Sequence, residues 1–78
     1  MTITEVGGYK LTQRAQTEAM MRGLGTKAVQ GIFRETVAEW PTANGLWFIT
    51  DGHNTAIISP YDSVVTSVIC GSQKSPKR

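Results

Sequence analysis

The second half of the chain contains three β-rich runs separated by short turn sequences, and this succession restricts the fold more than any other feature. The runs cover residues 46–50, 55–58 and 63–69. Asp51-Gly52 is a typical hairpin turn pair, and Pro60-Tyr61-Asp62 forms the second turn. Parallel pairing of consecutive strands needs a crossover of a dozen or more residues, so these connections predict an antiparallel meander.

The first half of the chain has the pattern of two helices. Thr12 is a suitable N-cap for a helix that ends at Gly23, and Thr26 is a suitable N-cap for the next one. Pro41 is expected to end the second helix because proline has no amide hydrogen. Apolar residues of this second segment recur at helical spacing and predict one buried stripe: Val29, Ile32, Phe33, Val37 and Trp40.

Residues 2–6 alternate between polar and apolar side chains, which predicts a short edge strand that ends at Gly7-Gly8. The expected fold is therefore α+β, with two N-terminal helices packed on a three- to four-stranded antiparallel β-meander. The 78 residues are enough for one domain, which we assign to residues 1–71. Residues 72–78 contain no aliphatic or aromatic side chain and predict a disordered basic tail.

Charge is distributed unevenly along the chain, which has a formal net charge of +2 and a pI of about 9.0. Residues 10–34 hold five Lys and Arg side chains against the single acid Glu18. Residues 35–71 hold four acids and no Lys or Arg, and the overall positive excess comes from residues 72–78. A partner that carries phosphate would therefore be recognised by residues 10–34.

Several classes of protein are excluded by composition. A single cysteine, Cys70, excludes an internal disulfide, and with the single histidine, His53, it cannot form a zinc site alone. We expect no metal and no other cofactor, and we interpret Cys70 as a small apolar filler at a strand end. No apolar run approaches the roughly 20 residues that span a bilayer, and no signal peptide is recognisable. We therefore expect a cytoplasmic protein that does not contact a membrane.

The basic residues of the first helix are candidates for nucleic-acid binding. Arg14 and Arg22 are eight residues apart, a little over two helical turns, so they point to nearly the same side. Lys10 precedes Arg14 by four residues, and Lys27 follows the link between the helices. Such a set can bind phosphates, and a solvated helix face explains the same pattern. Both interpretations stay open at this stage.

His53 is the natural general acid or base, because its unperturbed pKa lies near neutrality. Thr66 lies across the meander from it, and simple solvation of a turn histidine is the alternative explanation. Trp47 and Phe48 point to opposite sides of one strand, so one of them is expected outside the core. An exposed aromatic residue there would favour a surface for a ligand or partner.

Short stretches of the chain resemble a widespread small bacterial and phage domain. Residues 11–15, Met20 and Arg22-Gly23-Leu24 resemble its opening helix, and residues 64–68 resemble its final Val-Val-Thr-Val-type strand. Over residues 10–69 the chain is thus similar to the colicin-like and RelE-like ribonuclease toxins, whose fold is two helices followed by an antiparallel sheet. The chain departs from that pattern at Arg14, where the family usually has histidine, and at Glu18-Ala19, where Arg-Met is common.

The resemblance implies a metal-independent endoribonuclease of toxin type, in which a ribose 2′-hydroxyl attacks its neighbouring phosphate. His53 would be the acid or base, Arg14 and Arg22 would stabilise the phosphorane, and Thr66 would donate a hydrogen bond to it. The departure at position 14 leaves two alternatives, which are cleavage by electrostatic stabilisation alone and loss of catalysis. The implied partners are RNA and a cognate antitoxin or immunity protein.

Two hypotheses from other classes stand beside the ribonuclease. The first is a non-catalytic phage or mobile-element protein that inhibits a host enzyme or defence complex. The second is a small nucleic-acid-binding module that uses the basic helix. Either the strand at residues 2–6 or the last strand could pair across a dimer, and the sequence does not choose between a monomer and a dimer.

Overall fold

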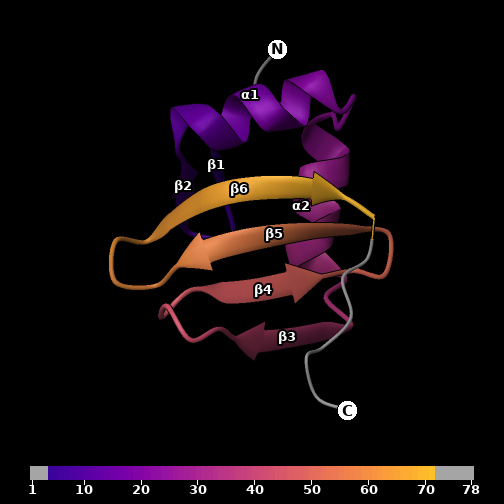
Figure 1. Cartoon of the computed structure of the whole chain (residues 1–78). Coiled ribbons are helices and arrows are strands. Elements are labelled where there is room, and N and C mark those ends of the chain that lie inside the picture. Colours follow the sequence, from indigo (N-terminus) through magenta and orange to yellow (C-terminus); the bar gives the residue numbers. More distant parts are fainter. Residues whose placement is uncertain (1–3, 72–78) are drawn as a thin grey trace.

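The computed structural model describes residues 4–71, in which two helices accompany a six-stranded mixed sheet (Figure 1). The elements are β1 (Glu5–Val6), β2 (Tyr9–Leu11), α1 (Gln13–Met21), α2 (Thr26–Arg34), β3 (Ala38–Pro41), β4 (Trp47–Thr50), β5 (Asn54–Ser59) and β6 (Val64–Cys70). The strand order is β1-β2-β6-β5-β4-β3. The α+β class is confirmed. The expected sheet of three or four antiparallel strands is wrong, because β3–β6 form such a meander but an N-terminal hairpin enlarges it.

The N-terminal hairpin accounts for both additional strands. Gly7 and Gly8 have φ angles of +58° and +86°, which two-residue hairpin turns require and which glycine adopts without strain. The chain therefore returns as β2 instead of ending an isolated edge strand. β2 then pairs in parallel with β6, placing Lys10 opposite Val64. Residues 1–3 and 72–78 are outside the described residues, so the start of the predicted strand at residue 2 and the predicted tail are not assessed.

Helix α1 begins and ends where its sequence predicts. The Thr12 Oγ accepts a hydrogen bond from the Ala15 amide at 3.1 Å and so caps the first turn. Gly23 has a φ of +72°, and the Leu24 amide donates to the Ala19 carbonyl at 2.8 Å. This pair of features is the left-handed glycine cap that commonly ends a helix. Each end of α1 is therefore fixed by local chemistry.

Helix α2 ends at Arg34, seven residues before the proline that was expected to stop it. The Thr36 hydroxyl donates to the Ile32 carbonyl at 2.8 Å, and the chain then extends into β3. Val37 is 68% exposed, and Trp40 pairs across the sheet with Phe48, so neither belongs to the predicted helical stripe. The extended conformation prevails because it gives these residues a hydrogen-bonded partner strand and an aromatic contact. The N-cap of α2 is Gly25 rather than Thr26, which is its first helical residue.

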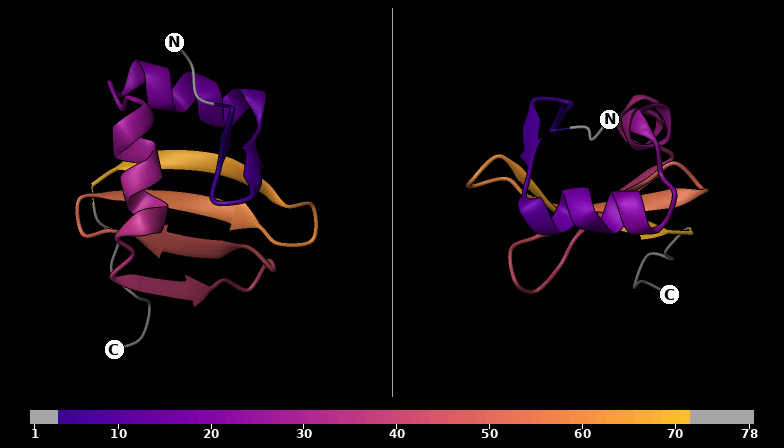
Figure 2. Two further views of the ribbon diagram at one scale, coloured as in Figure 1. Left: turned by 180° about the vertical axis from the view of Figure 1, so that it is seen from behind. Right: turned by 90° about the horizontal axis from the view of Figure 1, so that it is seen from above.

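The core lies between the concave side of the sheet and the two helices, as the views in Figure 2 show. α2 crosses behind β4 and β5, whereas α1 lies along the free edge of β6. Cys70 is exposed at the end of β6, so its interpretation as a buried filler is wrong. The buried apolar residues of the core are aliphatic, with Tyr9, Leu24, Phe33 and Trp47 packed partly buried against them: Val6, Leu11, Ala15, Ala19, Val29, Ile32, Ile49, Ala56, Ile58, Val65 and Val68.

Candidate nucleic-acid interface

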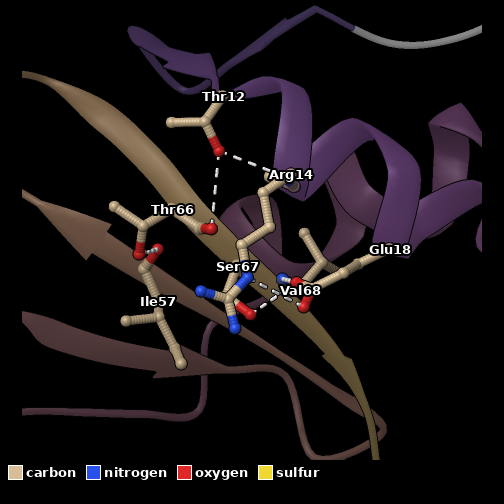
Figure 3. A network of polar contacts seen from close by, with 8 residues as sticks. Thr12, Arg14, Glu18, Ile57, Thr66, Ser67 and Val68 are labelled. Carbon is tan, nitrogen blue, oxygen red and sulfur yellow. Dashed lines mark hydrogen bonds and ion pairs between the residues drawn. The ribbon is translucent and has the colours of Figure 1, made fainter.

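Glu18 of α1 joins the helix to the edge of the sheet (Figure 3). Its Oε1 accepts hydrogen bonds from the Ser67 hydroxyl at 2.5 Å and from the Val68 amide at 3.1 Å. These groups lie on β6 beyond the two residues that β2 pairs with, where no strand of the described residues 4–71 covers the edge. The carboxylate therefore takes the place of a strand partner, since a sheet edge otherwise leaves its amides unsatisfied.

Arg14 is held beside this contact by the same carboxylate. Its Nε donates to the second oxygen of Glu18 at 3.3 Å, while 77% of its side chain is exposed. Partial burial raises the pKa of Glu18, but hydrogen bonds from Ser67 and Val68 and the charge of Arg14 outweigh that effect and lower the pKa below its usual value. Glu18 is therefore ionised at neutral pH, and Arg14 keeps N–H donors that can bind an anion.

The four residues predicted to bind phosphate follow the chain from β2 through α1 to the first turn of α2, and all of them are exposed. Arg14–Glu18 is the one ion pair within residues 4–71, so Lys10, Arg22 and Lys27 have no carboxylate partner in that range. Arg14 and Arg22 are about 12 Å apart along the helix axis. The sequence did not indicate that Glu18, midway between them, would partly neutralise the array. Nor did it indicate that the strand register of the hairpin would place Lys10 opposite Glu5.

The residues predicted to cleave RNA lie in separate places. His53 is exposed in the turn after β4, where its amide donates to the Asp51 carboxylate at 2.8 Å. Thr66 occupies an irregularity in β6, and its hydroxyl donates to the Ile57 carbonyl at 3.1 Å. The residue after His53 pairs with Cys70, which is four residues, or about 13 Å, along β6 from Thr66.

The network around Glu18 joins Arg14 to Ser67, the residue after Thr66, and His53 is not part of it (Figure 3). Arg22 lies at the opposite end of α1, where it lines a shallow hollow with Glu18 and Met21. Met21 is 80% exposed, so this hollow combines a cation with an apolar side chain. The four residues predicted to cleave RNA therefore do not form one cluster that could contact a single phosphate: His53, Arg14, Arg22 and Thr66.

The sequence did not indicate an aromatic pair on the face of the sheet that points away from the core. Trp40 of β3 stacks on Phe48 of β4 with ring centroids 5.5 Å apart and an interplanar angle of 21°. The helical spacing of residues 29–40 assigned Trp40 to the core, and the alternation of Ala-Glu-Trp-Pro was the signal that could have corrected it. The alternation of Trp47 and Phe48 was interpreted correctly, because Trp47 packs against the core and Phe48 does not.

Within residues 4–71, no three His, Cys, Asp or Glu side chains are grouped so that they could hold a metal ion. In the same part of the chain, neither helix has the length and apolar character needed to cross a membrane. Comparisons with protein-family models, curated proteins and solved structures find no match for this chain. Function is therefore inferred from the placement and chemistry of the residues described above.

Proposed function

We propose that this protein binds RNA through the basic array Lys10, Arg14, Arg22 and Lys27. The observation that carries the proposal is the exposure of all four cations, three of them without an ion-pair partner in the described residues. Exposed Arg and Lys side chains recognise phosphates without reading sequence and release counterions when they do so. The resemblance to ribonuclease toxins supports RNA as the nucleic acid.

Binding is better supported than cleavage. A phosphorane is stabilised only by groups that converge on it within hydrogen-bonding distance, and a general acid must reach the same phosphate. His53 and Arg14 are on different parts of the surface, and the Thr66 hydroxyl already donates to a carbonyl. We therefore assign the cations to positioning RNA, and the cleavage step implied by the resemblance remains a prediction about His53.

The proposal is tested by fluorescence anisotropy with a labelled oligouridine of about twelve nucleotides, a length that single-strand-binding surfaces cover. Arg22→Gln should weaken binding and lower the salt dependence by about 0.7 in log–log slope, the value for one phosphate contact on a single strand. The matched control is Arg34→Gln, because Arg34 is an exposed arginine in the last turn of α2, outside the array. Equal losses in both variants would contradict the proposed surface.

Cleavage is tested on the same RNA by gel electrophoresis, with His53→Ala beside the unmodified protein. Binding without cleavage is the expected result. Cleavage that disappears in His53→Ala would instead establish the ribonuclease hypothesis, because the single histidine would then be the acid or base. The absence of any RNA binding by the unmodified protein would overturn the proposed function.

A further inference from the structure

One face of the meander has no described element over it. The N-terminal hairpin and α2 lie behind strands β3–β6, and α1 lies along the upper edge (Figures 1 and 2). In a strand, alternate side chains point to opposite faces. The core residues Ile49, Ala56 and Ile58 define the covered face, so their strand neighbours point to the opposite one, which we call the outer face.

The outer face carries a row of side chains that runs straight across four strands. Trp40 pairs with Phe48, Phe48 pairs with Ile57, and Ile57 pairs with Ser67. All four are half-buried, and Trp40 and Phe48 stack on each other. Because neighbouring strands lie about 4.8 Å apart, the row is about 14 Å long. It begins with a stacked aromatic pair and ends at a hydroxyl.

Arg14 extends this row beyond the sheet. The Ser67 hydroxyl donates to Glu18, which in turn accepts from Arg14, so a single carboxylate fixes the guanidinium at the end of the row. Figure 3 shows the guanidinium of Arg14 in front of β6, beside Ser67. Its 77% exposure leaves the remaining donors accessible from the outer face.

The charges around the outer face favour an anion at one end only. The acids of the meander are not on strand positions that point to this face. Glu39 lies opposite Ile49 and lines a hollow on the covered side with Trp47. Asp51 binds backbone amides within its own turn, and Asp62 accepts from Ser59 in the next turn. The row thus has an uncharged aromatic end and an end formed by the Arg14–Glu18 ion pair, whose exposed guanidinium keeps further N–H donors.

We infer that a single strand of RNA lies across the outer face, with bases stacked on Trp40 and Phe48 and a phosphate bound by Arg14. This inference rests on the proposed RNA-binding function and names the form of RNA. Aromatic side chains on an open sheet stack on unpaired bases, whose flat faces a duplex would hide. Glu18 is a positioning residue in this arrangement, because it holds Arg14 beside Ser67 and Val68 at the end of the row.

The two tryptophans of the chain provide the test, because Trp40 is on the outer face and Trp47 packs against the core. In Trp47→Phe the tryptophan fluorescence comes from Trp40 alone, and in Trp40→Phe it comes from Trp47 alone. Each variant is titrated with oligouridine and with a duplex of equal length, after circular dichroism has shown that both are folded. Oligouridine should quench the emission of Trp40 and leave that of Trp47 unchanged, and the duplex should quench neither.

The affinity of Trp40→Ala for oligouridine should fall by roughly 5- to 150-fold, the loss that corresponds to one stacked base. The matched control Val37→Ala removes an exposed apolar side chain three residues earlier and should bind as the unmodified protein does. The quenching variant Trp47→Phe keeps the test decisive if Trp40→Ala does not fold.

Four other results would overturn the inference, and each of them points to a different cause. RNA binding with unchanged Trp40 emission and unchanged Trp40→Ala affinity would place RNA elsewhere and leave the proposed function intact. Equal quenching by the duplex would remove the single-strand preference. Emission of Trp40 that depends on protein concentration and not on RNA would show that a protein surface covers the outer face. No RNA binding at all would end both proposals.

Discussion

The two faces of the meander are made from similar apolar residues but meet different surroundings. On β5, Ile58 is 4% exposed against the helices, whereas its neighbour Ile57 is half-buried on the outer face. The fully buried apolar residues of the covered face are aliphatic, with Trp47 partly buried at its margin, while the stacked pair of Trp40 and Phe48 is on the outer face. The difference teaches that the largest side chains of a small domain need not be in its core, and that stability and binding can be assigned to opposite faces of one sheet.

The difference between the two faces is tested most directly by shortening the two neighbouring isoleucines of β5. Ile58→Ala should lower the free energy of unfolding by about 2–5 kcal/mol, because it leaves a cavity in the core. Ile57→Ala should cost roughly 1 kcal/mol or less, because no element of residues 4–71 packs over the outer face. Urea denaturation measures both values. Equal losses would mean that the outer face is as tightly packed as the core.

The hairpin behind the sheet gives a second contrast, between Gly7 and Gly8. Gly7→Ala should destabilise by about 2 kcal/mol, because it combines a left-handed φ with a Cβ placed 3.0 Å from Phe33. Gly8→Ala meets no atom within 4 Å and should cost only the conformational strain, about 1 kcal/mol. Thermal denaturation of both variants measures the difference. A larger loss at Gly8 would contradict the packing of Phe33 under the turn.

Glu18 links the two faces at the edge of β6, and its removal should show a pH signature. Glu18→Gln should cost about 1–2 kcal/mol at neutral pH, because charge-assisted hydrogen bonds to Ser67 and Val68 become neutral ones. The pKa of Glu18 is lowered in the folded state, so its contribution is complete above the unfolded pKa and is lost as the pH falls through the folded pKa.

The difference in stability between the unmodified protein and Glu18→Gln should therefore shrink as the pH falls below about 4.5. Urea denaturation at several pH values measures this difference. Glu39→Gln is the control, since Glu39 is an exposed acid that makes no ion pair within residues 4–71. A constant difference across the pH range would indicate that Glu18 acts by packing and not by charge.

The smallest expected effect is at the start of α1. Thr12→Ala should cost about 1 kcal/mol, because the Ala15 amide loses its acceptor and the contact with the Thr66 carbonyl disappears. Thr12→Ser keeps the hydroxyl and should restore most of the loss. Chemical denaturation of the two variants measures the effect. No rescue by serine would show that the methyl group of Thr12 matters more than its cap.

Local chemistry explains which parts of the fold were predictable. The ends of α1 and the strands β4, β5 and β6 follow from caps, turns and alternation that lie within a few residues of each other. The end of α2 and the place of Trp40 were not predictable, because helical spacing and strand alternation compete there and the pairing of β3 with β4 decides between them. The parallel pairing of β2 with β6 depends on residues at opposite ends of the domain.

The candidate site was also predictable where it depends on local sequence and not where it depends on distant contacts. Residue type and spacing found the exposed arginines of α1, since both ends of that helix were correct. The role of Glu18 was hidden, because its partners Ser67 and Val68 are about fifty residues away in sequence. The row from Trp40 to Ser67 exists only through the register of four strands, which no local pattern specifies.

The parallel contact between β2 and β6 has a consequence for the order of assembly. Lys10 pairs with Val64, so the hairpin cannot take its final position until nearly the whole domain has been synthesised. The pairings of β3 with β4, β4 with β5 and β5 with β6 can form earlier, because they join neighbouring segments, whereas closing a long loop is slow. The β1–β2 hairpin is thus the last part of the sheet to be placed, although it precedes every other element in the sequence.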